Sequence, residues 1–219
     1  MSTAEFIVRD VAGLEGLYDS PAWAAVAKET DELIAPYKAF VEAAPYLTLA
    51  TIGPDGPDCS PRGDAPGFVK IADAKTILIP NRDGNNRNES LRNIVHDPRV
   101  AIHFLVPGCC ESLRVKGKAS ISIDPVMTAS FAVNGRSPRT VIVVAIERVY
   151  FHCGKAIRRS KLWDAAQEAD RPNLPKPNAM LAAIQWQRVR SAIGTRRPKP
   201  VPAEPRTETT IDRGLTEKA

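Results

Sequence analysis

The sequence predicts a mainly β protein, an antiparallel barrel with helices at its flanks. The middle of the 219-residue chain holds six or seven short segments of strand character, separated by turn signals and by only two short helical segments. A doubly wound parallel sheet would need a helix of about a dozen residues between successive strands. The pattern therefore excludes that architecture and favours an antiparallel barrel.

Composition places the chain among ordinary globular proteins, with 43% hydrophobic and 25% charged residues. Its length favours one compact domain with extensions, which can bury a core without a disulfide or metal. No apolar run reaches the roughly 18 residues of a membrane span, and the N-terminus lacks the apolar centre of a signal peptide. We therefore expect a cytoplasmic protein that does not bind membranes.

Residues 1–44 are expected to form an N-terminal helical segment. Ser20–Pro21 places a capping residue before a proline at the first helical position, and Thr30–Glu32 begins a second helix that continues to Ala43. Pro45 ends that helix. Its apolar residues recur at spacings of three and four and form one face: Leu33, Ile34, Tyr37, Phe40 and Val41.

The barrel is predicted over residues 45–165. The Gly53–Gly56 segment is a strong turn signal between the first two strands, and the segment that begins at Ser112 alternates well between apolar and polar residues. The expected strands are Tyr46–Ile52, Asp58–Arg62, Phe68–Ile71, Thr76–Ile79, Arg99–Val106, Ser112–Ile123 and Thr140–Phe151. The expected helices among them are Glu89–Val95 and Asp124–Val133.

Helices return after the last strand. They are predicted over Lys155–Ala169 and Asn178–Ile193, with a proline-rich joint at Arg171–Pro177, so that residues 166–194 form a helical extension. Residues 195–219 are rich in proline and hold six basic against four acidic side chains. We expect a disordered or extended, solvated tail, and the chain's net charge of +5 says little about the folded part.

The cysteines and histidines do not predict a metal site. Without an export signal, the four cysteines are expected to be reduced thiols. A zinc site from Cys109, Cys110, His152 and Cys153 is conceivable, but the spacing matches no zinc motif. His96 and His103 are interpreted as surface or packing residues. The side chains of the sequence that can bind a soft metal are Cys59, Cys109, Cys110, Cys153, His96, His103 and His152.

The common catalytic motifs are absent from the sequence: there is no GxSxG, no phosphate-binding P-loop, no GxGxxG after a strand and no HExxH. What the chain offers instead is three clusters of polar and basic residues at strand ends or helix starts: Ser60–Asp64, then Pro80–Asn81 together with Arg87–Asn93, and His152–Trp163. The second lies on a loop that opens into a helix, where free N–H groups attract an anion. Together the clusters favour an anionic, planar ligand.

Each cluster also has a structural interpretation. Arg62 could pair with Asp64 across a turn, the Arg158–Lys161 run could be a solvated helix face, and Trp163 could be a packing residue. A nucleic-acid-binding barrel would need exposed aromatic residues interleaved with basic ones. The chain has only six Phe, four Tyr and three Trp, mostly at apolar-patterned positions, so no nucleic-acid partner is expected.

Four stretches of the sequence resemble the pyridoxamine 5′-phosphate oxidase-like flavoproteins. They are GPDGPDCSPRGD at Gly53–Asp64, the long segment from IPNRDGNN through HFLVPG at Ile79–Gly108, ESLRVKGKASI at Glu111–Ile121 and HCGKAIRRSKLW at His152–Trp163. The last resembles the branch of probable FMN-dependent enzymes. The family implies a six-stranded split barrel of the FMN-binding type and a homodimer that holds FMN in two equivalent sites at its interface.

The resemblance also implies roles for individual residues. Pro80 and Asn81 correspond to the place where family members contact the flavin beside its ribityl chain. Arg87, Asn88 and Ser90 lie where the loop and the helix start bind the FMN phosphate.

Other residues match the edge of the ring and the second subunit. Ser60 and Arg62 lie on the strand that follows the isoalloxazine edge, and Ser112 lies on the strand that reaches toward the partner's cofactor. The residues that match those closing the site from the second subunit are Lys155, Arg158 and Trp163.

The resemblance favours an FMN-dependent oxidoreductase that acts on a small-molecule substrate, with catalytic residues unknown. The Ser-Arg-Lys run and the C-terminal Trp/Arg/His signature of the true pyridoxamine phosphate oxidases are missing, so vitamin B6 oxidation is not expected. Related barrels hold a deazaflavin or haem. The alternative is therefore a non-enzymatic flavin-, deazaflavin- or haem-binding protein for storage or sensing.

Overall fold

The computed structural model describes residues 6–164 and 174–193. The chain divides into two compact units, Met1–Gln167 and Glu168–Ala219. The described part of the second unit is dominated by one helix, α8 (Pro177–Ile193). The tail predicted over residues 195–219 lies outside the described residues. The prediction of a helix over Lys155–Ala169 is wrong in its extent, because α6 (Lys155–Ser160) ends where Lys161 takes a left-handed backbone with a φ of 51°.

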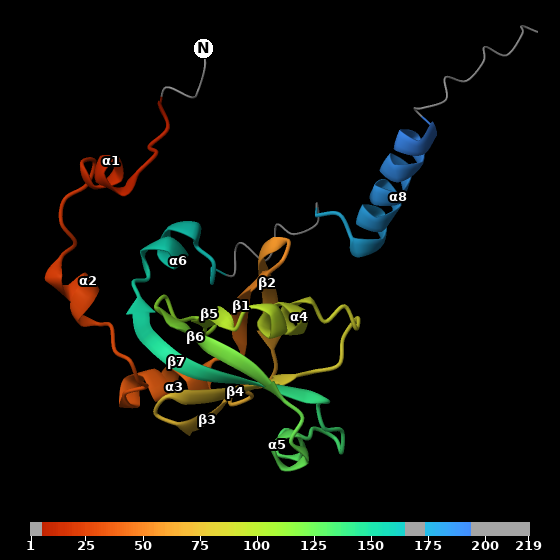
Figure 1. Ribbon diagram of the computed structural model, residues 1–219, viewed down its shortest axis with the longest axis horizontal. Coiled ribbons are helices and arrows are strands. Elements are labelled where there is room, and N and C mark those ends of the chain that lie inside the picture. The colour runs from red at the N-terminus through yellow and green to blue at the C-terminus, as the bar shows by residue number, and fades with distance from the viewer. Residues whose placement is uncertain (1–5, 165–173, 194–219) are drawn as a thin grey trace, which may run out of the picture. The chain divides into compact units, whose positions relative to one another are not determined.

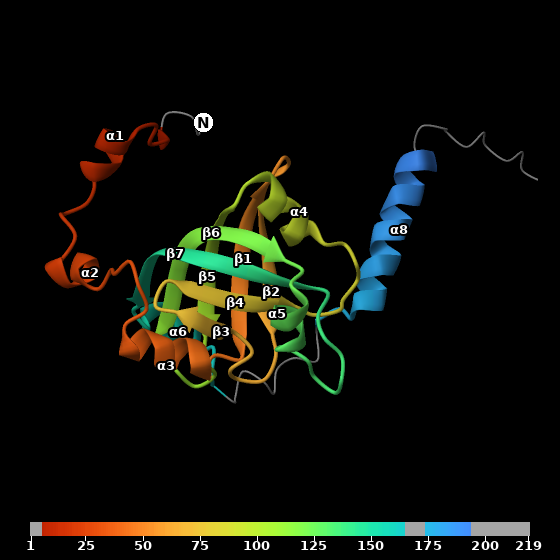
Figure 2. The same ribbon diagram turned by 60° about the horizontal axis from the view of Figure 1, so that its bottom comes forward.

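The first unit is built on one antiparallel sheet of seven strands, strongly curved in both views (Figures 1 and 2). The strands are β1 (Tyr46–Gly53), β2 (Gly56–Gly63), β3 (Lys70–Asp73), β4 (Thr76–Asn81), β5 (Arg99–Leu105), β6 (Ser112–Ser122) and β7 (Thr140–His152). Their order is β2-β1-β5-β6-β7-β4-β3. The mainly β, antiparallel prediction is confirmed, and each of the seven segments expected from the sequence contributes a strand. The six-stranded barrel that the family resemblance implied is not confirmed.

Every strand boundary agrees with the sequence pattern to within two residues, and the third strand is the one shifted by two at both ends. It was predicted over Phe68–Ile71 but covers Lys70–Asp73. Phe68 and Val69 are buried before the strand begins, after a turn in which Gly67 has a φ of +82°. The apolar run therefore marked burial in the core, which the sequence pattern cannot distinguish from strand pairing.

Two helices interrupt the strands, as predicted: α4 (Glu89–His96) and α5 (Pro125–Ala129). The prediction that α5 extends to Val133 is wrong. Asp124 caps its start by accepting hydrogen bonds from the N–H groups of the next turn. The chain then leaves the helix for a tight turn in which Val133 and Arg136 pair through their backbones.

The N-terminal residues form three helices, α1 (Val11–Glu15), α2 (Trp23–Ala27) and α3 (Ala35–Ala43). The predicted starts are wrong for both later helices. Ala22, not Ser20, precedes α2, and Thr30 forms a β-bridge with Val149 instead of starting α3. The helix begins only after this non-local pairing, with Pro36 in its first turn.

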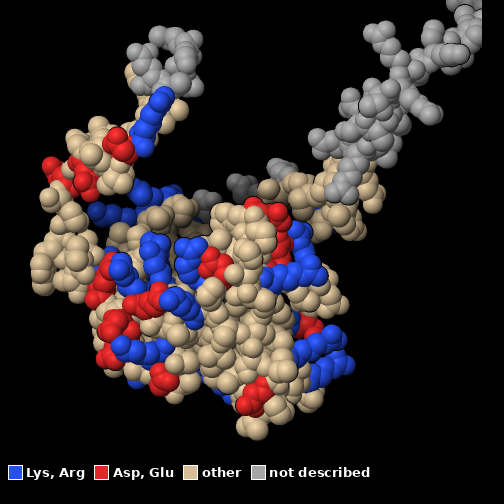
Figure 3. Space-filling model, in the orientation of Figure 1, with Lys and Arg blue, Asp and Glu red and all other residues tan. Residues whose placement is uncertain are grey.

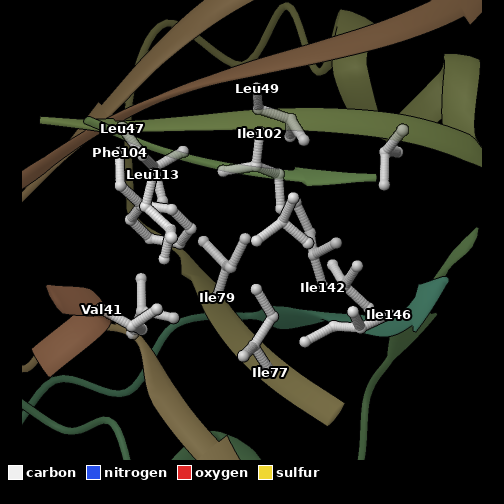
Figure 4. Close-up of a cluster of buried hydrophobic side chains, with 14 of the residues drawn as sticks. Val41, Leu47, Leu49, Ile77, Ile79, Ile102, Phe104, Leu113, Ile142 and Ile146 are labelled. Carbon is white, nitrogen blue, oxygen red and sulfur yellow. The ribbon is translucent and has the colours of Figure 1, made fainter. Parts of the chain in front are cut away.

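The core fills the concave side of the sheet (Figure 4). Alternate residues of β1 and β5 face inward, and α3 covers one end with Tyr37 and Val41. Of the predicted apolar face of this helix, Ile34 is 40% exposed. The largest fully buried side chains include Leu47, Leu49, Ile77, Ile79, Ile102, Phe104, Leu113 and Ile142. Among the described residues, no helix has the length and apolarity needed to cross a membrane.

Helix α4 is fixed to β1 by a buried hydrogen bond. The Asn93 amide donates to the Thr51 hydroxyl over 3.1 Å, and the neighbouring Ile94 is buried in the core. Gly53 allows this approach, because a Cβ atom there would overlap the Asn93 carboxamide. The contact sets where the first turn of α4 lies.

Gly53→Ala is expected to destabilise the protein. The added methyl group must displace the Asn93 side chain from its buried hydrogen bond, at a cost of about 1–3 kcal/mol in the free energy of unfolding. Gly84→Ala is the matched control, since a Cβ atom at Gly84 meets nothing within 4 Å. Urea denaturation of the two variants tests this, and equal stabilities would contradict the role given to the contact.

Candidate functional site

A polar cavity of about 410 Å³ lies between β2, the end of β4 and the start of α4. Its volume falls in the range of about 300–1,000 Å³ that is usual for small-molecule sites. The lining residues are Asp58, Ser60, Pro61, Arg62, Asn81, Arg82, Gly84, Asn85, Asn86, Arg87, Asn88, Glu89 and Ser90. The structure thus brings the first and second predicted clusters together.

Strand β2 supplies one wall of the cavity through its inward-facing residues. Asp58, Ser60 and Arg62 alternate with more exposed neighbours, as the period of two in a β-strand requires. Ser60 and Arg62 lie opposite Leu49 and Leu47 of β1, which point into the core. This wall of the cavity is therefore continuous with the core face of the sheet.

Arg62 is a half-buried cation with an unused donor. One terminal nitrogen donates to Asn81 Oδ1 over 2.9 Å. Its Nε is buried without a hydrogen-bond partner in the described structure. Burial lowers the pKa of the guanidinium, and the charge of Asp58 opposes that shift. Because an arginine stays charged in proteins, this side chain offers a positive charge and a free N–H group.

The first turn of α4 supplies the opposite wall. Asn88 precedes the helix in the left-handed region, with a φ of 53°, and its side chain caps none of the described N–H groups. The leading N–H groups of a helix have no intrahelical partner and carry partial positive charge. The Ser90 hydroxyl is buried and lies 2.8 Å from that of Ser60, which connects the two walls.

The remaining arginines of the lining differ in how firmly they are held. Arg82 pairs with Asp64 over 2.8 Å and donates to the Phe131 carbonyl over 2.6 Å, so it fastens the loop after β4. Arg87 has 73% of its side chain exposed and pairs with Glu89 over 2.6 Å. Arg87 can therefore turn toward a ligand, whereas Arg82 has a structural role. The pairing of Asp64 with Arg82 also replaces the turn pairing with Arg62 that the sequence allowed.

Pro80 does not line the cavity. It is buried in β4 opposite Val141 of β7, where it precedes Asn81. Its contribution is to the position of Asn81, which accepts the hydrogen bond from Arg62.

The third predicted cluster lies outside the cavity lining within this chain. Helix α6 (Lys155–Ser160) follows β7, and Arg158 pairs with Glu111 over 3.1 Å. Trp163 Nε1 donates to the Cys109 carbonyl over 2.7 Å, while Lys155 is exposed. The single chain therefore joins two of the three clusters.

Ser112 is buried and hydrogen-bonded to His103. Its hydroxyl lies 2.7 Å from His103 Nε2, at the start of β6. Burial lowers the pKa of His103, and the charges of Arg114 and His152 lower it further. The pair is thus a packed polar contact, and His103 is neutral at pH 7.

Several lining residues were not singled out from the sequence. Asp58 shares the inward face with Ser60 and Arg62, so the period of two in the strand was a signal that could have identified it. Arg82, Asn85 and Asn86 lie beside residues that were identified, in the loop between β4 and α4. The pairing of Arg82 with a distant loop could not be read from local sequence.

A second cavity does not suit an anionic ligand. Its volume is about 460 Å³, and its charged lining residues are Glu29, Asp31, Glu32 and Glu147 with the single cation Arg148. Within residues 6–164 and 174–193 no group of His, Cys, Asp and Glu could hold a metal, and the four cysteines there are free thiols.

Comparison with known proteins gives one match by family. The family model described as pyridoxamine 5′-phosphate oxidase matches residues 33–153. No curated protein matches the chain.

Solved structures with low identity also match. HupZ of Group A Streptococcus is 20% identical over 53% of this chain and 91% of its own, with a TM-score of 0.44. General Stress Protein 26 of Bacillus anthracis is 15% identical over 52% and 88%, with a TM-score of 0.41. An F420 reductase is 20% identical over 55% and 98%, with a TM-score of 0.39.

Lowering the pH from 7 to 5 is expected to reduce the stability of the fold through His103. Its pKa in the folded chain lies below the ordinary 6.5. The unfolded chain therefore binds the extra proton first, and the free energy of unfolding falls as the pH decreases from 6.5 toward the folded pKa. His103→Gln should flatten this part of the pH profile, as measured by urea denaturation. His96→Gln, at an exposed position, is the control, and an unchanged slope in His103→Gln would contradict the prediction.

Proposed function

The chain belongs to the pyridoxamine 5′-phosphate oxidase family, and we propose that it is a cytoplasmic, FMN-dependent oxidoreductase that acts as a homodimer on a small-molecule substrate. The proposal rests on one observation above all. The inward face of β2 and the uncapped start of α4 converge on a cavity that combines a free arginine donor with free helix N–H groups. This donor set suits a ligand with a phosphate at one end and hydrogen-bond acceptors at the other.

The residues of the cavity fit a phosphorylated flavin. Arg87, Asn88 and Ser90 would hold the phosphate at the start of α4, where the helix dipole favours negative charge. Ser60 and Arg62 would face the ring edge, and the unused Arg62 Nε would donate to a ring carbonyl or nitrogen. Asn81, held by Arg62 and by the preceding Pro80, would lie beside the ribityl chain.

When bound, FMN supplies the redox chemistry itself, as a hydride acceptor and donor. The chain's own residues bind the cofactor, orient it and set its electrostatics. The positive charge of Arg62 would stabilise negative charge on the reduced ring. This division of labour accounts for the lack of a conventional acid–base motif in the sequence. The phosphate-loop and C-terminal signatures of vitamin B6 oxidases are absent, so a different small-molecule substrate is proposed.

The proposed homodimer completes the site. In it, six strands of the curved seven-stranded sheet would form the split barrel that the family resemblance implies. A second copy would contribute Lys155, Arg158, Trp163 and the strand that begins at Ser112. Those residues lie outside the cavity lining of their own chain, which supports their use by a partner. Two such sites would follow from the two-fold symmetry of the pair.

The visible spectrum of the purified protein tests the cofactor. Oxidised-flavin bands, with FMN released on denaturation, are the expected result. A haem Soret band, a deazaflavin, or a colourless protein that ignores added FMN would overturn it. Anaerobic reduction by NADH or NADPH, followed by reoxidation with candidate acceptors, separates an enzyme from a storage or sensor protein.

Arg87→Ala is expected to weaken FMN binding with little effect on the fold. The exposed side chain contributes a charge-assisted bond to the phosphate, so the dissociation constant should rise about 10- to 100-fold. Arg92→Ala is the matched control, since Arg92 is an exposed arginine five residues further on, on α4, and lies outside the cavity lining. Flavin fluorescence titration measures both, and equal affinities would remove Arg87 from the site.

Arg62→Met should make reduction of the bound flavin harder. Loss of a half-buried cation near the ring removes about 1.5–3 kcal/mol of stabilisation from the reduced form, which lowers the two-electron midpoint potential by roughly 30–65 mV. The measurement is a reductive titration against a reference dye. Arg99→Met, at an exposed site on β5, should leave the potential unchanged, and a potential that is also unchanged in Arg62→Met would contradict the assignment.

A further inference from the structure

The N-terminal arm, residues 6–27, exposes an unusual amount of apolar surface. Every residue of the arm is exposed, and Phe6 and Trp23 are each 83% exposed. Single exposed apolar side chains are normal on a protein surface, but a contiguous group marks an interaction site. The large apolar side chains of the arm are Phe6, Ile7, Val8, Val11, Leu14, Leu17, Tyr18, Trp23 and Val26.

The two helices of the arm need a surface to pack on. α1 and α2 have five residues each and bury none of them against the described chain. Isolated helices shorter than about 12–15 residues are marginal in water, and helices in proteins are held mainly by packing of an apolar face. Val11 and Leu14 lie three residues apart on α1 and so share one face of it, and both are exposed. Asp10 caps α1 by accepting from Gly13 N–H over 2.7 Å, which defines the helix but covers no apolar surface.

The root of the arm is firmly attached to the body. Thr30 and Val149 exchange backbone hydrogen bonds of 3.0 and 2.8 Å, beyond the last residue at which β4 pairs with β7. The Tyr37 hydroxyl donates to the Lys28 carbonyl over 2.6 Å, and Glu29 pairs with Arg148 over 3.2 Å. The arm therefore starts from a fixed point, so its exposure does not come from a loose attachment.

We propose that the arm packs onto a second copy of this chain, in an exchange in which each protomer holds the arm of the other. This inference rests on the homodimer proposed above and assigns to it a second area of contact, separate from the cofactor cavity. Each copy has both an arm and a body, so in a two-fold exchange the apolar side chains of both arms pack against a body.

The area available matches what a stable dimer requires. Fully covered Phe, Tyr and Trp side chains bury about 150–250 Å² each, so Phe6, Tyr18 and Trp23 alone offer about 450–750 Å². The six aliphatic side chains of the arm add to this. A standard protein interface buries about 800 Å² on each partner, so two exchanged arms meet that requirement.

The charges of arm and body are complementary. The arm holds Arg9 against Asp10, Glu15 and Asp19, and is therefore net acidic. Residues 28–164 hold nineteen basic and fifteen acidic residues, and Figure 3 shows basic side chains over the visible face of the body, interspersed with acidic ones. An acidic arm with an apolar face is thus suited to a body that carries excess positive charge.

Photo-crosslinking in the full-length protein tests the exchange. A benzophenone amino acid in place of Trp23 is expected to yield covalent dimers on denaturing gels, with peptides that join residue 23 to the body of another copy. The same probe in place of Val126 is the control, because Val126 is similarly exposed, at 80%, but lies on α5. Crosslinks only within one chain, or equal dimer yields from both positions, would overturn the proposal.

Trp23→Asp provides an independent measurement. It should raise the dimer dissociation constant at least about tenfold in sedimentation analysis, as expected for an interface aromatic residue, while Val126→Asp should not. Because Trp23 is exposed in the single chain, the circular dichroism spectrum should not change. A native dimer that is unaffected by Trp23→Asp and gives no crosslink would refute arm exchange and leave the homodimer intact. A native monomer would refute both.

Discussion

The attachment of helix α4 to β1 and β2 is the constraint on which the candidate site depends. Asn93 holds the helix to Thr51 of β1 within the core, and Ser90 meets Ser60 of β2 at the edge of the cavity. These two contacts fix both the height and the rotation of the first turn. As a result, the free N–H groups of the helix line the same cavity as the unused donor of Arg62. The glycine at position 53 is part of this arrangement, since a side chain there would separate helix and strand.

The placement of Arg62 is unfavourable for folding alone. A buried donor without a partner costs about 1–3 kcal/mol, and partial burial of a cation adds to that cost. The core beside it is made of large aliphatic side chains and can offset such a local loss. Buried unsatisfied groups are few in native proteins. The unpaired Arg62 Nε lies beside a polar cavity. A ligand that supplies the missing acceptor explains it better than a structural role does.

The strands could be predicted because the features that define them lie within short stretches of sequence. Alternation of side chains and turn residues identified the strands, and the clusters on β2 and at α4 were visible as polar residues at element ends. The predictions that were wrong concern residues whose positions depend on contacts distant in the sequence. Thr30 pairs with Val149, and Asp64 binds Arg82 rather than Arg62; both partners lie far from these residues in sequence or across a loop. Among the further lining residues, Asp58 had a local signal in the period of two of its strand. Arg82, Asn85 and Asn86 line the cavity because of how the loop after β4 folds, and that fold depends on distant contacts such as the one between Arg82 and Phe131.

Two separate features leave one chain incomplete: the basic segment of α6 lies outside the lining of its own cavity, and the arm exposes its apolar residues. In the proposed dimer, a second copy completes both. Cofactor binding and arm exchange would then favour the same assembled state, although they involve different surfaces. Ligand that binds only the dimer shifts the association equilibrium by mass action, and a more stable dimer in turn binds the ligand more tightly. The arm would thus influence cofactor affinity without touching the cofactor, through the stability of the pair that encloses it.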